Sequence, residues 1–437
     1  MPGPLPRFRT YSTFGTYAAV AWDALCLRTG RGDDPRRLED AVRERTGAPF
    51  ALCVPQARVG IFLAIRGLIS PGQKVILSPY TIYDVVNMVL CAGGVPVFAD
   101  IERESCNLDP RRVEERMDAD TGAVLATHLH GLAMDLEPLA GICRRRGVAL
   151  VEDAAQAFGA RVRGRWVGTF GDAGIYSFGM YKNINAFYGG MVTTSRAELR
   201  ERLAGEMATL PPQPLGAYLG RTGYGVMTEL LTWPPFFGSV TFRVFRHAYL
   251  RDIEWLNRRV REENNPKAKR TLPAPYLRRM QPVQARLALR GLDRVERDAQ
   301  IRLGFARMYE RGLADLPELL RPPFREDGSH IYLQYPIQYG DRKKLVKHMM
   351  RHGCDVAAQH MRNCADLDCF AEFRQDCPNA RATADSVVVL PTYPKYSPRD
   401  VERNINAIRA FFGRGPAPEG VRAAAREIGR KEEGRPR

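Results

Sequence analysis

VEDAAQAFG at residues 151–159 and GTFGDAGIYSFGMYKNINAFYGGMV at residues 168–192 are the stretch that decides the fold of this chain. The first part continues an apolar run, Val148–Val151, that is followed by Glu152 and Asp153. The second part contains an apolar run that ends at Ser177, and Lys182 follows shortly after it. Short apolar runs that end in polar residues indicate parallel strands, and such sheets bind ligands at the carboxyl ends of their strands.

An aspartate, a serine and a lysine in this order suit a pyridoxal phosphate (PLP) site. The aspartate can keep the pyridine nitrogen protonated, the lysine amine can form a Schiff base with the aldehyde, and the serine hydroxyl can hold the phosphate. Each residue alone has an ordinary explanation, since an aspartate at a strand end is commonly a turn residue and a lone lysine is commonly solvated. The order and the spacing favour the cofactor because the whole string resembles one known family.

The whole string resembles the DegT/DnrJ/StrS family of PLP-dependent sugar aminotransferases, and the resemblance covers roughly residues 37–412. Its motifs occur here in the family's order: LEDAVRERTGAPFALCV, SPGQKVILSPYT, VPVFADI, THLHG, EDAAQAFGA, SFGMYK, GGMVTT, RRMQPVQARLALRGLDRVERD and VVVLPTYPKYSPRDVERNINAI. The resemblance implies an aminotransferase that moves an amino group, with glutamate as the usual donor, to a keto sugar that is nucleotide-linked. Surface polysaccharide and secondary-metabolite sugars are the pathways it implies.

The resemblance also assigns residues. Lys182 and Asp153 are the expected catalytic residues, with Lys182 carrying the cofactor and Asp153 meeting the pyridine nitrogen. Gln156 is expected at the cofactor's phenolic side and Ser177 at its phosphate. An intact Lys182 argues against the family branch that has histidine there for dehydration.

Two places near the expected cofactor depart from the family's pattern. Where the family commonly has Ser-Gly-Thr, the chain has Gln56, Ala57 and Arg58, so we expect Ala57 and Arg58 to share the cofactor phosphate; the alternative is an ordinary helix start with a solvated arginine. At the family's aromatic over the cofactor ring stands Ile82, which leaves Tyr80 or Tyr83 as the ring contact, and we include Tyr83 in the site.

The resemblance implies the type I PLP-transferase fold, an α/β class. We expect a large domain at residues 36–203 with a mainly parallel, seven-stranded type of sheet between helices. An N-terminal arm (1–35), an apolar and basic insertion or interface segment (204–269), a long helix with a smaller α/β domain (270–413) and a disordered tail (414–437) complete the expected organisation. The family works as a homodimer, with the contact expected at Tyr276–Gln284. There Leu277 replaces an asparagine that reaches the partner's phosphate.

The segment 204–269 has two interpretations. Its centre, GYGVMTELLTWPPFFGSVTF, carries Glu229 as its one charge, and Arg243, Arg246 and Arg251 follow. The first interpretation is a hairpin buried against the large domain or a partner subunit. The second is a peripheral contact with an anionic membrane, in which Trp233, Phe236 and Phe237 enter the headgroup layer.

Composition bounds the remaining possibilities. The chain has 437 residues and a net charge of +16, which favours polyanionic ligands, although no nucleic-acid-binding motif is visible. The nine cysteines fit no metal-ligand spacing, so we expect no metal and reduced thiols. No apolar run of spanning length is present, and we expect a cytoplasmic protein, peripheral at the inner face of the membrane if the second interpretation of 204–269 holds.

Two other functions stay open at this point. A non-catalytic PLP-fold scaffold or regulator at a membrane would account for the departures at Ala57, Ile82 and Leu277. A PLP-dependent elimination or epimerisation of a sugar would use the same cofactor site for different chemistry.

Overall fold

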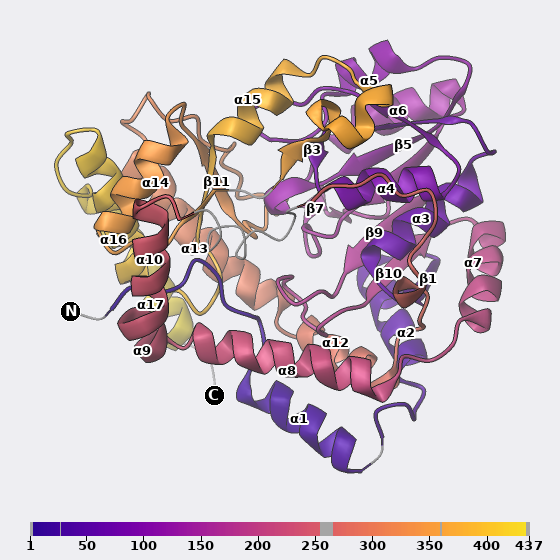
Figure 1. Cartoon of the computed structure of the whole chain (residues 1–437), viewed down its shortest axis with the longest axis horizontal. Helices are drawn as coiled ribbons and strands as arrows, with labels where there is room; N and C mark the ends of the chain where they lie inside the picture. Colours follow the sequence, from indigo (N-terminus) through magenta and orange to yellow (C-terminus); the bar gives the residue numbers. More distant parts are fainter. Residues whose placement is uncertain (1–2, 27, 254–264, 359–360, 434–437) are drawn as a thin grey trace.

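A seven-stranded sheet between two layers of helices forms the large domain (Figure 1). The computed structural model describes residues 3–26, 28–253, 265–358 and 361–433. In spatial order the strands are β1 (Phe50–Val54), β10 (Gly190–Thr194), β9 (Ala173–Ser177), β6 (Ala149–Asp153), β5 (Thr121–Thr127), β2 (Lys74–Leu77) and β4 (Val95–Phe98). The antiparallel pairs are those that β10 forms with β1 and β9, and the other pairs are parallel, so the expected mainly parallel sheet is confirmed.

Helices cover both faces of this sheet because the buried strands are apolar on both sides. One face is packed by α3 (Ala57–Leu68), α4 (Tyr83–Cys91) and α7 (Ala197–Thr209). The other is packed by α2 (Asp34–Thr46), α5 (Pro110–Arg116), α6 (Leu136–Arg146) and α12 (Pro282–Leu292). Short elements complete the domain: β3 (Tyr80–Thr81), η1 (Leu129–Gly131), β7 (Arg161–Val162), β8 (Arg165–Trp166) and η3 (Ala274–Tyr276).

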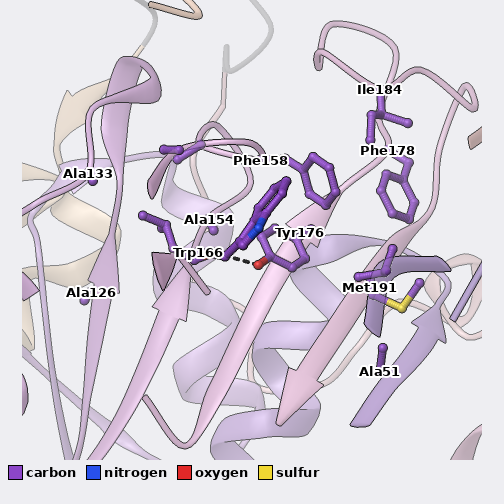
Figure 2. Close-up of a cluster of buried hydrophobic side chains, with 14 of the residues drawn as sticks. Ala51, Ala126, Ala133, Ala154, Phe158, Trp166, Tyr176, Phe178, Ile184 and Met191 are labelled. Atoms are coloured by element: carbon purple, nitrogen blue, oxygen red, sulfur yellow. Dashed lines mark hydrogen bonds between the residues drawn. The ribbon is translucent and has the colours of Figure 1, made fainter. Parts of the chain in front are cut away.

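An aromatic cluster supports the second of these faces (Figure 2). The ring of Phe158 lies 4.8 Å from the ring of Tyr176, 5.5 Å from Trp166 and 6.5 Å from Phe178, measured between centroids. The Tyr176 hydroxyl donates to the Val167 carbonyl at 2.5 Å. Because Tyr176 and Phe178 flank Ser177 in sequence, this cluster fixes the backbone at the end of β9.

The smaller domain follows α12. Its elements are α13 (Val295–Leu313), β11 (Tyr335–Gln338), α14 (Arg342–Arg351), β12 (Ala357–Ala358), β13 (Arg362–Asn363), η4 (Cys364–Asp366), η5 (Asp368–Phe373), α15 (Pro378–Ser386), β14 (Val387–Leu390), α16 (Pro398–Phe411) and α17 (Glu419–Glu433). The sheet of this domain has the order β11-β14-β12, and β13 pairs instead with β3 of the large domain. The expected long helix is two helices, because the chain turns at Asp293 and Arg294.

The expectation of a disordered tail at 414–437 is wrong for the residues described there. Helix α17 packs on α13, with Val421, Ala424 and Ile428 buried. These residues follow helical spacing, and their small apolar stripe is hidden in the sequence among glycine, proline and charged residues.

The segment expected at 204–269 begins later than predicted, because α7 continues to Thr209. It forms α8 (Leu215–Leu231), α9 (Pro234–Phe236), a π-helical turn η2 (Phe237–Thr241) and α10 (Phe242–Leu250). Residues 254–264 lie outside the described residues. The prediction that Phe237 enters a headgroup layer is wrong, since Phe237 is buried in the small-domain core, whereas Trp233 and Phe236 are exposed.

Residues 3–13 of the N-terminal arm form no helix or strand, and α1 (Phe14–Leu25) follows them. It joins several parts of the molecule. Arg7 pairs with Asp355 of the small domain, and Arg9 pairs with Glu229 of α8. The Pro6 carbonyl accepts a hydrogen bond from the Tyr393 hydroxyl at 2.7 Å. The expected N-terminal arm is therefore a folded one that bridges the two domains.

The Glu152 carboxylate holds the connection between β8 and β9. It is fully buried and accepts hydrogen bonds from the backbone N–H groups of Gly168, Phe170 and Gly171 at 2.6–2.7 Å. We predict that Glu152→Gln lowers the free energy of unfolding by about 2–4 kcal/mol. The substitution replaces one carboxylate oxygen with an –NH₂ group, which cannot accept hydrogen bonds from the backbone N–H groups that face it. Urea denaturation of the apo protein measures this loss.

Glu137→Gln is the matched control. Glu137 is exposed and pairs with Arg163 at the surface, so its substitution should change the free energy of unfolding by less than about 1 kcal/mol. An equal effect of the two substitutions would show that the three hydrogen bonds to Glu152 contribute no special stability.

Candidate active site

The register of the sheet brings two predicted site residues to one face. Asp153 lies opposite Ile175 in the β6–β9 pair, and Ser177 is two residues further along β9. Since side chains alternate along a strand, Asp153 and Ser177 point to the same face as Val151 and Ile175, which is the face that α3 covers. Glu152 points to the opposite face, which separates its structural role from the site.

The Asp153 side chain is a buried carboxylate with capacity for another donor. Its Oδ1 accepts a hydrogen bond from Ala155 N–H at 3.0 Å. Burial raises the pKa of this carboxyl above its ordinary value, and the Ala155 hydrogen bond and the charges of Lys182 and His128 oppose that rise. A cationic N–H donor at Asp153 would favour the ionised form, because it would replace the lost hydration.

The start of α3 forms the second part of the site. Val54, Gly190 and Ser177 lie in one row across β1, β10 and β9, and α3 begins just beyond Val54, at Ala57. Gln56, at the N-cap of this helix, makes no side-chain cap hydrogen bond, so the first N–H groups of the helix are available to an anion. A Cβ atom at Gly190 would lie 2.8 Å from the Ala57 nitrogen, so glycine allows the helix start to approach the sheet.

The side chain of Arg58 belongs to a polar cluster beside the helix start. Its guanidinium pairs with Asp84 and donates to the Tyr276 hydroxyl at 3.0 Å. Lys269 also pairs with Asp84, at 2.8 Å. Although burial opposes it, hydrogen bonding from Lys269 and the Arg58 charge lower the pKa of Asp84 below its ordinary value. A contact between Arg58 and a phosphate stays a prediction, and in this chain it would compete with Asp84.

Of the two tyrosines considered for the ring contact, Tyr83 is the better placed. Tyr80 is fully buried in the hydrophobic core, where burial, reinforced by the nearby Cys106, raises the pKa of its hydroxyl. Tyr83 begins α4 and is half-buried, with the Lys269 ammonium 5.7 Å from its ring centroid. Contact between Tyr83 and a cofactor ring stays a prediction.

Lys182 lies on a loop between β9 and β10 that distant residues hold in place. Its own N–H donates to the Gly179 carbonyl at 3.0 Å. Asn183 donates to the Phe158 carbonyl at 2.6 Å, and Asn185 donates to the Ser12 hydroxyl at 2.8 Å. Phe187, near the end of the loop, has a φ of 65°, which is strained for a non-glycine residue. We call residues 178–189 the lysine loop.

Gln156 is held by a group that the sequence interpretation left unassigned. Its Oε1 accepts a hydrogen bond from the His130 N–H at 2.9 Å, and His130 has a φ of 56°. The His130 Nδ1 lies 3.0 Å from the Gln334 Oε1. This leaves the –NH₂ end of Gln156 as the end that can donate to a cofactor's phenolic oxygen. The THLHG motif contained the signal, but only tertiary contacts identify its second histidine as the partner.

The arm residue Phe8 was also missed. Its ring meets the ring of Tyr181, the residue before Lys182, edge to face at 4.7 Å. Nothing in the local sequence connects positions so far apart, because the contact depends on how the arm crosses the lysine loop.

A cavity of about 500 Å³ elsewhere does not compete with this site. Leu150, Asp172 and Thr194 are among the residues that line it. Leu150 and Asp172 lie toward the amino ends of β6 and β9, whereas Asp153 and Ser177 lie at the carboxyl ends.

The residues present fit PLP. A buried carboxylate with unused acceptor capacity suits a protonated pyridine nitrogen, and the uncapped start of α3 beside Ser177 suits a phosphate. Lys182 lies close enough to Asp153 for its charge to lower the carboxyl pKa. The arrangement can therefore hold the cofactor's ring, phosphate and aldehyde at one edge of the sheet.

Comparison with known proteins supports this interpretation. The sequence profile of the DegT/DnrJ/EryC1/StrS aminotransferase family matches residues 23–209 and 253–409. The spore coat polysaccharide biosynthesis protein SpsC of Bacillus subtilis (strain 168) is 26% identical over 391 residues, which cover 87% of this chain and 90% of SpsC. GDP-perosamine synthase of Vibrio cholerae is 36% identical over 175 residues, which cover 39% of this chain and 48% of that protein.

Proteins of known structure share this fold. The aminotransferase TlmJ from Streptoalloteichus hindustanus superposes with a TM-score of 0.73 at 24% identity, covering 94% of this chain and 99% of TlmJ. Residues 210–252, which contain α8, α9, η2 and α10, fall between the two stretches that the family profile matches.

Proposed function

The chain belongs to the DegT/DnrJ/EryC1/StrS aminotransferase family, whose members depend on PLP, and we propose that it transfers an amino group from glutamate to a nucleotide-linked keto sugar. The observation that carries the proposal is the convergence of Asp153, Ser177 and the start of α3 at one edge of the sheet, beside Lys182. The names of two relatives, a polysaccharide biosynthesis protein and a GDP-sugar synthase, support a role in making surface polysaccharide or secondary-metabolite sugars.

Each residue has a defined task in this proposal. Bound PLP supplies the electron sink that amino transfer needs. The Asp153 carboxylate holds a proton on the ring nitrogen, and Gln156 donates to the phenolic oxygen. Ser177 and the N–H groups at Ala57 and Arg58 hold the phosphate. The Lys182 amine would hold the aldehyde, and as a free amine it would be the base that moves a proton between the substrate carbon and the cofactor carbon.

The function is tested with purified protein, PLP, glutamate and a panel of nucleotide-linked keto sugars, followed through the cofactor's visible spectrum. Glutamate should change the spectrum, one acceptor should restore it, and borohydride reduction should fix the cofactor on Lys182. Lys182→Ala should abolish both the spectral change with glutamate and its reversal by the acceptor. Lys74→Ala should not, because Lys74 is a surface residue that pairs with Asp118. A cofactor attached to a different lysine, or a spectrum that no amino donor changes, would contradict the proposal.

Asp153→Asn separates the electronic role of the carboxylate from cofactor binding. The variant should retain PLP and lose two or more orders of magnitude in the rate of the half-reaction with glutamate, because the ring nitrogen is no longer held protonated. Stopped-flow absorbance measures that rate. Asp135→Asn, at an exposed helix start, should leave the rate unchanged.

The same variant has a stability readout. Since burial raises the pKa of Asp153, ionisation of this carboxyl destabilises the apo protein as pH rises through and above the ordinary carboxyl range. Asparagine does not ionise, so apo Asp153→Asn should be at least as stable as the apo wild type at neutral pH. A normal rate with glutamate would show that Asp153 does not meet the ring nitrogen.

We also propose that the working form is a homodimer, with the contact at Tyr276–Gln284. Arg279, two residues after Leu277 in this segment, is exposed, and its backbone N–H donates to the Pro211 carbonyl at 3.0 Å. Sedimentation at assay concentration should give twice the chain mass. Full activity in a sample that sediments as monomer would refute the dimer.

A further inference from the structure

Large hydrophobic side chains are exposed on one part of this molecule. With the exception of Phe8, all those that are exposed in the described ranges belong to α1 or to the segment 210–252. The exposed fractions are high: 62% for Trp22, 62% for Leu230, 55% for Trp233 and 40% for Phe236. We call the exposed side of α1, α8, α9, η2 and α10 the apolar face. An apolar surface of this extent marks an interaction site.

The outward side of α8 has no charge. Its exposed residues are glycine, alanine, leucine, valine, methionine and tyrosine. Glu229 turns inward and pairs with Arg9 and Lys395, and the guanidinium of Arg221 lies over the Tyr188 ring at 4.1 Å. A helix that faced water would carry charged residues on that side. This arrangement therefore suits a helix whose outer side is covered by an apolar medium.

Basic residues border the apolar face. Arg243, Arg246 and Arg251 are exposed on α10 and at its end, next to the exposed Val240 and Val244. Asp252, the exposed acidic residue that follows Arg251 in the sequence, is paired with Lys343 and Lys347. The apolar face with its arginines thus complements a layer that is apolar inside and anionic at its surface, and tryptophan is favoured at that boundary.

Helices α8 and α1 run along the lower edge of the molecule in Figure 1, whereas α10 runs upward from the end of α8 and α9. No helix among the described residues is long and apolar enough to span a bilayer. The family profile matches residues 23–209 and 253–409, so α8, α9, η2 and α10 lie outside the stretches that this chain shares with the profile.

We propose that the apolar face rests in the surface of an anionic phospholipid membrane, with Leu230, Trp233 and Phe236 in the headgroup layer and the three arginines on the lipid phosphates. The inner side of the same helix packs on the lysine loop. A Cβ atom at Gly225 would lie 2.6 Å from the Phe187 ring, and the Tyr17 hydroxyl donates to the Gly225 carbonyl at 3.3 Å. The proposed membrane contact and the loop that carries Lys182 thus lie on opposite sides of α8.

Vesicle co-sedimentation of the PLP-loaded protein tests the proposal. Phosphatidylcholine vesicles containing phosphatidylglycerol should bind the wild type, and pure phosphatidylcholine should bind it far less. Leu230→Glu/Trp233→Glu should lower binding at least tenfold. Ala119→Glu/Ala371→Glu, which adds the same charge at exposed positions elsewhere, should leave binding unchanged.

The arginines have a separate test. Arg243→Gln/Arg246→Gln/Arg251→Gln should lower binding to anionic vesicles by about a hundredfold, since each arginine near an anionic surface contributes roughly fivefold. Arg144→Gln/Arg145→Gln/Arg146→Gln removes three exposed arginines from α6 and should have little effect. Circular dichroism and sedimentation of every variant establish that fold and oligomeric state are retained.

Three outcomes would overturn the proposal. The first is a wild type that binds no vesicles. The second is binding that the four variants change equally. The third is an assembly larger than a dimer that forms without lipid and separates in Leu230→Glu/Trp233→Glu, which would assign the apolar face to another copy of the chain. Each can be distinguished from failure of the aminotransferase proposal, because the readout is binding and not turnover.

Discussion

A carboxylate buried at the end of a central strand constrains the rest of this structure. Asp153 loses its hydration in the fold, and Ala155 N–H with the nearby charges of Lys182 and His128 compensates for only part of that loss. Glu152, its neighbour in sequence, has three backbone donors on the opposite face of the sheet. The contrast explains why one carboxylate is a structural anchor while the other is left ready for a cationic ligand.

Contacts with residues that are distant in the sequence hold the lysine loop in place. The N-terminal arm reaches the lysine loop through Ser12 and Asn185, and it reaches α8 through Arg9 and Glu229. Helix α8 in turn packs on Phe187 of the lysine loop. A segment outside the family profile has therefore become part of the support of the residue that is proposed to carry the cofactor, so changes on its outer side can affect the site without a direct contact.

The sequence predicts the sheet and the edge at which the site lies, because strand-end polar residues and side-chain alternation are local properties. Asp153 and Ser177 share a face, as the strand pattern implies. The partners of Arg58 could not be predicted, because Lys269 and Tyr276 come from a distant part of the chain. The burial of Phe237 beside the exposed Phe236 depends in the same way on the small domain, and α17 was missed because its apolar stripe is short.

The proposed amino transfer depends on a ring nitrogen that Asp153 keeps protonated. Nuclear magnetic resonance of the holoenzyme, reconstituted with PLP labelled with nitrogen-15 in the ring, measures that protonation state directly. We expect the chemical shift of a protonated pyridinium in the wild type and that of a neutral pyridine in Asp153→Asn. A neutral-pyridine shift in the wild type would contradict this expectation.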